Sequence, residues 1–99
     1  MIPGTTPTHI FTIPLAAAEV AELRITYSQG GKVAFQKELA DCHLADQTVT
    51  VRLEQEDTLK ISNNVDVQIQ MKVKTTGGDV LVSKIVKRSA AIVLDREAI

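Results

Sequence analysis

The chain has 99 residues, 44% of them hydrophobic, and a formal net charge of −1. That length suits one domain rather than two, and the near-zero charge lacks the basic excess that binding to nucleic acid or an anionic membrane requires. We therefore expect a single domain over residues 1–99 that binds neither. Only three aromatic residues are present, Phe11, Tyr27 and Phe35, too few for a platform on which sugars or bases stack.

Cys42 is the only cysteine, so no intramolecular disulfide can form and the domain must be stable without one. The N-terminus has neither the basic region nor the apolar region of a signal peptide, and no apolar run approaches the roughly 20 residues that span a bilayer. We expect the protein to be made in a reducing cytoplasm.

The first seven residues contain Pro3, Gly4 and Pro7, a composition that favours an extended N-terminal arm. Such an arm either frays or grips a neighbouring chain. Residues 8–13 alternate as a short strand that Pro14 ends. Residues 15–22 are rich in alanine and glutamate but too few for an independent helix, which predicts a turn or one helical turn.

Residues 23–36 are predicted to form a hairpin around Gly30 and Gly31. Apolar residues alternate with polar ones on both sides of the glycines. A three-residue loop at 29–31 would place Tyr27 opposite Val33 and Ile25 opposite Phe35, which keeps the apolar residues on one face. We therefore expect the longer loop.

Residues 39–47 predict a corner where the chain crosses to another sheet, and residues 48–53 alternate as a further strand. The acidic residues 54–58 predict a single helical turn. Leu59 and Ile61 would then close the end of the core, and Asn63 with Asn64 supplies a turn.

The cleanest pattern lies at residues 65–74, where apolar and polar residues alternate without exception. Gly77 and Gly78 predict a hairpin back to a strand that begins at Val80. Val80 and Val82 are at even-numbered positions and Ile85 is at an odd-numbered one, so a regular strand would place Ile85 on the opposite face. We therefore expect a β-bulge near Ser83 that returns Ile85 to the apolar face. Residues 90–94 are apolar enough for a last strand, and residues 95–99 form a polar C-terminal tail.

Short alternating strands at about ten-residue intervals, with glycine hairpins and almost no helix, predict an all-β fold. We expect an antiparallel immunoglobulin-like β-sandwich of about seven strands, with a small β-barrel as the alternative. One wall of its core is the apolar face of residues 65–85, and the other members are Phe11, Ile25, Tyr27, Phe35, Val51 and Leu53.

His9, Cys42 and His43 are the candidates for imidazole or thiolate chemistry, but their spacing matches no zinc or nucleophile motif. Asp41 or Asp46 would have to join them by folding. Cys42 and His43 are adjacent in a strand and so point to opposite faces. We predict no metal, no cofactor and no catalytic residues, with Cys42 half-buried at a corner.

The charged runs have ordinary explanations. Glu54, Glu56 and Asp57 near Lys60 predict a solvated acidic turn rather than an acid/base cluster. The cations Lys84, Lys87 and Arg88 predict a solvated edge strand that discourages sheet-to-sheet association. The glycine pairs are hairpin glycines, since neither opens a helix that could hold phosphate.

The most regular surface is the polar face of the central strand, formed by Gln68, Gln70, Lys72 and Lys74. It is either plain solvent-exposed surface or a flat docking surface, because glutamine carries both donors and acceptors and can pair across an interface.

The chain contains the stretches GTTPTHIFTIP at 4–14, LRITYSQGGKV at 23–33, DCHL at 41–44, TVTVRLEQEDTLKI at 48–61, VQIQMKVKTTGGDVLVSKI at 67–85 and the terminal LDREAI. Together these stretches resemble a group of short phage and prophage proteins of Firmicutes. The resemblance covers essentially the whole chain. It implies a place among virion structural genes of the tail and baseplate region, and it defines no catalytic or binding residue.

The resemblance therefore implies a virion structural protein, an adaptor of the tail, baseplate or fibre region that docks onto other virion proteins and onto copies of itself. It would be made in the host cytoplasm and located in the virion. Two alternatives stay open: a capsid decoration or head-associated protein, and a stand-alone module for host glycans or peptides. We do not expect an enzyme, nor a small-molecule substrate.

Overall fold

The structure, a computed structural model, describes residues 1–83 and 85–88. These residues form eight strands, one turn of α-helix and two short 3-10 helices. The elements are β1 Thr8–Thr12, η1 Ala17–Glu19, β2 Val20–Gln29, β3 Lys32–Glu38, η2 Leu39–Asp41, β4 Cys42–Ala45, β5 Thr48–Arg52, α1 Gln55–Thr58, β6 Val67–Thr75, β7 Val80–Val82 and β8 Val86–Arg88. Lys84, the strand expected at 90–94 and the tail at 95–99 lie outside the described residues.

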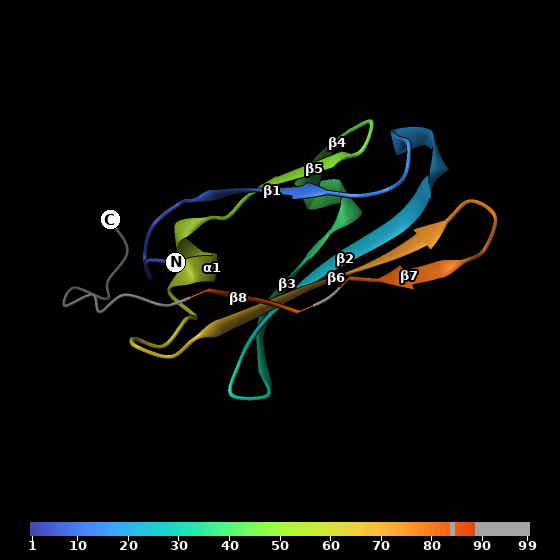
Figure 1. Ribbon diagram of the computed structural model, residues 1–99. Helices are drawn as coiled ribbons and strands as arrows, with labels where there is room; N and C mark the ends of the chain where they lie inside the picture. Colours follow the sequence, from blue (N-terminus) through green and yellow to red (C-terminus); the bar gives the residue numbers. More distant parts are fainter. Residues whose placement is uncertain (84, 89–99) are drawn as a thin grey trace.

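Two antiparallel sheets pack face to face (Figure 1). The smaller sheet has the order β1-β5-β4, and the larger has the order β3-β2-β6, with β7 and β8 both pairing with the far side of β6. The described strands do not close into a barrel, because each sheet ends in edge strands. The predicted all-β antiparallel sandwich is therefore confirmed.

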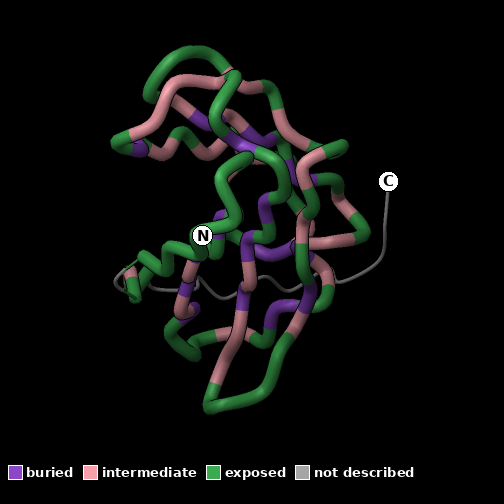
Figure 2. The backbone as a smooth tube through the Cα atoms, turned by 90° about the vertical axis from the view of Figure 1, so that its right-hand side faces the viewer, coloured by how far each residue is buried: buried purple, intermediate pink, exposed green. Residues whose placement is uncertain are grey.

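Both sheets contribute buried residues, coloured purple in Figure 2, and these residues form one hydrophobic core cluster. Five of the expected core residues are buried, namely Ile25, Tyr27, Phe35, Val51 and Leu53, and Phe11 packs partly buried against them. On β6 the alternation holds as expected, with Val67, Ile69, Met71 and Val73 all buried. The strand begins two residues later than the pattern suggested, and Val65 is exposed.

The predicted register of the β2–β3 hairpin is wrong. Gly30 and Gly31 form a two-residue turn, with φ of 55° and 80°, because a type I′ turn needs positive φ at both positions. A β-bulge beside Tyr27 then shifts the pairing by one residue, so that Tyr27 pairs with Phe35 rather than with Val33. Val33 is left on the outer face with 60% of its surface exposed.

The predicted bulge near Ser83 is present. Two residues lie between Ile69 and Lys72 on β6, whereas three lie between their partners Val86 and Val82 on the facing strands. The Ser83 hydroxyl accepts a hydrogen bond from the Met71 amide at 2.9 Å. The residue that the bulge returns to the inner face is Val86, however.

The expectation for Ile85 was wrong, since its side chain is 54% exposed. Val80 and Val82 also differ from expectation. They lie opposite Lys74 and Lys72, and residues directly opposite in an antiparallel pair share one face. Both valines are therefore on the outer face of the sheet.

The N-terminal arm neither frays nor reaches away from its own domain. Pro3 is fully buried. The Gly4 carbonyl accepts a hydrogen bond from Gln55 Nε2 at 3.1 Å, and the Thr5 carbonyl accepts one from Thr58 Oγ1 at 2.7 Å. Residues 1–7 thus pack on α1 and close that end of the sandwich, because the short helix offers polar side chains to the otherwise unpaired carbonyls of the arm.

The first two of the three connections between the sheets follow the sequence expectations. Residues 15–22 contain the single turn η1, and the chain then enters β2. The predicted corner at 39–47 contains η2 and an additional strand, β4, which pairs with β5. None of the helices in the part of the chain that the structure describes is long and apolar enough to cross a membrane.

Candidate docking surface

The four residues predicted to form a docking surface all lie on the outer face of β6. Gln68 and Gln70 are partly exposed, and Lys72 and Lys74 are exposed, while every residue between them is buried. The four residues lie in one row, because β6 alternates strictly and the side chains of its inner face are buried in the core.

The neighbouring strands extend this row into a wider face. Residues of β2 lie directly opposite it, with Arg24 facing Lys72 and Thr26 facing Gln70. Residues of β3 come next, and Arg24 Nε lies 3.1 Å from Glu38 Oε1 in an ion pair whose two side chains are more than half exposed. An exposed pair of this kind contributes at most about 1 kcal/mol to stability, so its effect is to orient the two side chains.

One of the predicted docking residues is engaged within the chain. Gln70 Nε2 donates a hydrogen bond to the Ser83 carbonyl at 3.0 Å. Its side chain therefore supports the bulge that joins β7 to β8, and it is less available to a partner than its row position alone suggests.

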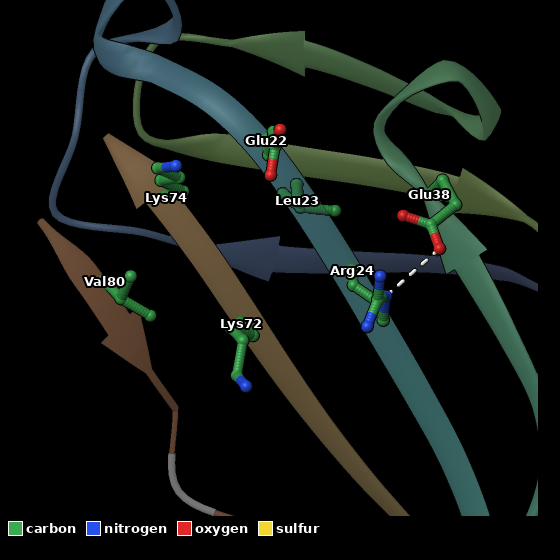
Figure 3. A pocket seen from close by; sticks show the side chains of 7 residues that line it. All are labelled: Glu22, Leu23, Arg24, Glu38, Lys72, Lys74 and Val80. Carbon is green, nitrogen blue, oxygen red and sulfur yellow. Dashed lines mark hydrogen bonds and ion pairs between the residues drawn. The ribbon is translucent and has the colours of Figure 1, made fainter. Parts of the chain in front are cut away.

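The exposed valines of β7 complete the surface. Val80 is 56% exposed and Val82 is 53% exposed, and each lies beside a lysine of β6. Figure 3 shows Val80, Lys72 and Lys74 around a shallow hollow of about 230 Å³, which Glu22, Leu23, Arg24 and Glu38 also line. We call Lys72, Lys74, Val80 and Val82 the lysine–valine patch.

Sequence reasoning missed the two valines because it assumed that both faced the core. The hairpin register contains the signal that could have found them. A three-residue loop at 76–78 pairs Thr75 with Asp79 and therefore sets Val80 opposite Lys74 and Val82 opposite Lys72.

The outer face has an excess of positive charge among the described residues. It carries four cations, Arg24, Lys72, Lys74 and Lys87, and two carboxylates, Glu22 and Glu38, which gives a net charge of +2. Of these four cations, only Arg24 has a carboxylate partner within 4.0 Å in the part of the chain that the structure describes. Lys87 and Arg88 are exposed on β8, as expected for a solvated edge.

The candidate metal or catalytic residues do not come together. His9 and Cys42 flank Val51 from opposite sides, so two strand spacings, about 9.6 Å, separate their backbones. His43 points to the outer face. The part of the chain that the structure describes holds no group of three His, Cys, Asp or Glu residues that could bind a metal ion.

The two aspartates that could have joined such a site have structural roles. Asp41 accepts a hydrogen bond from the Glu38 amide at 2.9 Å, and Asp46 accepts one from the Ala17 amide at 3.1 Å. Cys42 is half-buried at the corner, as predicted. Burial and the nearby Asp41 carboxylate raise the pKa of its thiol, against the opposing effect of Lys37, which keeps the thiol protonated and unreactive.

His9 has a partner that the sequence did not indicate. Its Nδ1 lies 2.8 Å from the Tyr27 hydroxyl, and the Tyr27 ring stacks on Phe35 with centroids 4.4 Å apart. Burial lowers the pKa of His9, and the positive charges of the N-terminus and Arg88 add to this effect. Burial likewise raises the pKa of Tyr27, so the hydroxyl keeps its proton and can donate it to neutral His9.

The predicted solvated acidic turn is wrong for one of its members. Glu54 and Glu56 are exposed, but Asp57 Oδ2 lies 2.6 Å from Lys37 Nζ and both side chains are about 14% exposed or less. Burial alone would raise the pKa of Asp57. Hydrogen bonds from Lys37 and from the Glu54 amide, with the charges of Lys37 and Lys60, lower it below its usual value.

Comparison with known proteins identifies no relative: no family model, no curated protein and no solved structure matches the chain. The geometry of the lysine–valine patch and the sequence resemblance are therefore the two grounds for a functional proposal.

Proposed function

We propose that this protein is a bacteriophage virion structural protein, a β-sandwich adaptor of the tail, baseplate or fibre region. It acts by docking, and its partners are other virion proteins and copies of itself. The resemblance of nearly the whole chain to short phage and prophage proteins supports the virion assignment. The observation that supports docking is the lysine–valine patch. In it, two valines are more than half exposed beside two lysines that have no carboxylate partner within 4.0 Å among residues 1–83 and 85–88.

The patch has the features of a protein interface on a small scale. Interfaces combine an apolar centre with a polar, solvent-accessible rim, and here Val80 and Val82 lie beside the charged ends of Lys72 and Lys74. The buried inner face of β6 holds the row rigidly, which lowers the conformational entropy lost on binding. A matching partner surface would carry apolar side chains with Asp or Glu around them.

The aromatic residues favour docking over recognition of sugars. Tyr27 and Phe35 are buried and Phe11 is half-buried, so none of the three offers a fully exposed ring on which a sugar could stack.

Incorporation into particles tests both parts of the proposal. The source phage is grown in cells that supply tagged wild-type protein or the Val80→Asp/Val82→Asp double variant, and purified particles are analysed by mass spectrometry. We expect wild-type protein in the particle and at least about a tenfold loss for the double variant, because two carboxylates would replace the apolar centre and neutralise the lysines.

The matched control is Ile10→Asp, an equally exposed apolar position, 68% exposed, on the outer face of the other sheet. It should be incorporated as well as wild type, and thermal unfolding should show all variants folded. Particles that lack the wild-type chain would disprove the virion assignment. Equal incorporation of the double variant would disprove the docking face alone, and labelling the chain on intact particles distinguishes tail from head.

A further inference from the structure

The strand β7 has a free backbone edge (Figure 1), since among the described strands it pairs only with β6. Two hydrogen bonds at 2.8 Å flank its three residues, from the Thr75 amide to the Asp79 carbonyl and from the Ser83 amide to the Met71 carbonyl. The odd-numbered residues therefore turn their backbone groups toward β6. Because antiparallel hydrogen bonding alternates, the N–H and C=O groups of Val80 and Val82 point to the open side, where a further strand could pair with them.

Leu81 gives this edge an apolar inner side. It lies opposite buried Val73 of β6 and is 41% exposed. A hollow of about 260 Å³ extends from these two residues to residues 12–15, at the end of β1. Apart from Thr12 and Ser83, every residue that lines it is apolar. A strand added to β7 would place every second side chain beside Leu81 and this hollow, so those side chains must be apolar.

The outer side of the same edge is positively charged. Val80 and Val82 lie opposite Lys74 and Lys72. Glu22 of β2 lies opposite Lys74 from the other side, but neither lysine has a carboxylate within 4.0 Å in the described part of the chain. An added strand would lie two strand spacings, about 9.6 Å, from the backbone of β6. Lysine side chains are long and can extend over the valines toward it, so carboxylates on its outer face would complement the patch.

A second copy of the chain does not offer such a strand. Its free edges among the described residues are β1, β3, β4, β7 and β8. β1, β4 and β7 contain no carboxylate, and β8 contains Lys87 and Arg88 without one. β3 contains a single carboxylate, Glu38, beside Lys37, and Glu38 is already paired with Arg24. Charge complementarity therefore favours a segment of a different protein.

We propose that the open edge of β7 binds an extended segment of a different protein as an added strand, with Asp or Glu on its outer face and apolar residues on its inner face. Backbone hydrogen bonds join the segment to Val80 and Val82, and its apolar side chains enter the hollow beside Leu81. Its carboxylates lie near Lys72 and Lys74. This inference rests on the proposed docking role of the lysine–valine patch, and it names the partner of that patch.

Peptide binding to the full chain tests the proposal. The probes are three labelled peptides, SEVEVES, SKVKVKS and SEEEVVS, of which the last has the composition of the first without its alternation. Fluorescence anisotropy at up to millimolar protein measures the affinity, and hydrogen exchange locates the binding site. We expect SEVEVES to bind at least about ten times more tightly than either of the other peptides and to protect the amides of Val80 and Val82.

Variants of the chain separate the two features of the edge. Lys72→Glu/Lys74→Glu should reverse the preference, so that SKVKVKS binds more tightly than SEVEVES, because the charges are exchanged. Val82→Pro removes an N–H that points away from β6, which an edge strand tolerates, and it should weaken SEVEVES binding at least about fivefold. Val82→Thr keeps this N–H and should bind SEVEVES as wild type does. Thermal unfolding should show that all variants are folded.

Equal or undetectable affinity for the three peptides would disprove the proposal, as would protection at another sheet edge or an unchanged preference in the lysine variant. Protection of Val80 and Val82 that rises with protein concentration in the absence of peptide would also disprove it, because a second copy would then occupy the edge. If the peptides fail but Val80→Asp/Val82→Asp is still lost from particles, the docking face stands and only the added strand is wrong.

Discussion

At the scale of single residues, His9 has the most informative environment. It is the only histidine on an inner face, and it links the edge strand β1 to the Tyr27–Phe35 stack in the core. Its lowered pKa means that the folded state resists protonation more than the unfolded state does. Between the two pKa values the unfolded state binds more protons, so stability must fall as pH decreases through this range.

We therefore predict that the melting temperature falls between about pH 7.5 and about pH 5.5, and that His9→Gln removes much of this fall because glutamine does not titrate. The measurement is thermal unfolding followed by circular dichroism across this range. His43→Gln is the matched control, since His43 lies on the outer face, and it should keep the wild-type pH dependence. The same dependence in His9→Gln would show that other groups cause it.

At the scale of elements, α1 depends on tertiary contacts. Four residues cannot form a stable helix alone. Here Asp57 accepts hydrogen bonds from the Glu54 amide and pairs with Lys37 of β3, while Thr58 donates to the N-terminal arm. The turn is thus held from both sides, by the larger sheet and by the arm.

We predict that Asp57→Ala destabilises the protein by about 3 kcal/mol, because it leaves the largely buried Lys37 ammonium without its partner. Lys37→Met should cost less, since it removes the charge and keeps an apolar side chain of similar length. Chemical denaturation measures both. Glu38→Gln, at the exposed Arg24–Glu38 pair, is the control and should change stability by less than about 1 kcal/mol.

At the scale of the whole molecule, the N-terminal arm closes the α1 end of the sandwich. Pro3, Thr58 and Ile61 are all fully buried, and the Thr58 hydroxyl donates a hydrogen bond to the Thr5 carbonyl of the arm. The arm is therefore part of the fold, and it is not available for exchange with a neighbouring chain unless these contacts break.

We predict that deletion of residues 1–6 lowers stability by about 2 kcal/mol, which corresponds to a fall in melting temperature of roughly 8 to 16 °C for a domain of this size. The deletion removes a buried proline and an acceptor of the Thr58 hydroxyl. Light scattering should give the same number of subunits for the deleted and full chains. Loss of an oligomer on deletion would mean that the arm acts between chains. Thr6→Ala, at an exposed position, is the control and should be neutral.

The sequence by itself determined the fold class and most of the strands, because local alternation and hairpin glycines report which face of each strand is buried. Residues 67–75, the helical turn at 55–58 and the polar row from Gln68 to Lys74 could be predicted in this way. The bulge near Ser83 was placed correctly, but the argument for it was not, because Val80, Val82 and Ile85, which it assumed to face the core, are all exposed.

Tertiary structure alone decided the relations that depend on register and on distant partners. Val80 and Val82 lie outside because pairing with β6 places them beside Lys74 and Lys72, although their own alternation fits either face. Asp57 is buried because Lys37 approaches it from another strand, and the pKa of His9 is lowered because folding buries its ring. A one-residue change in register reverses every side chain of a strand, and no local pattern encodes a partner that is tens of residues away.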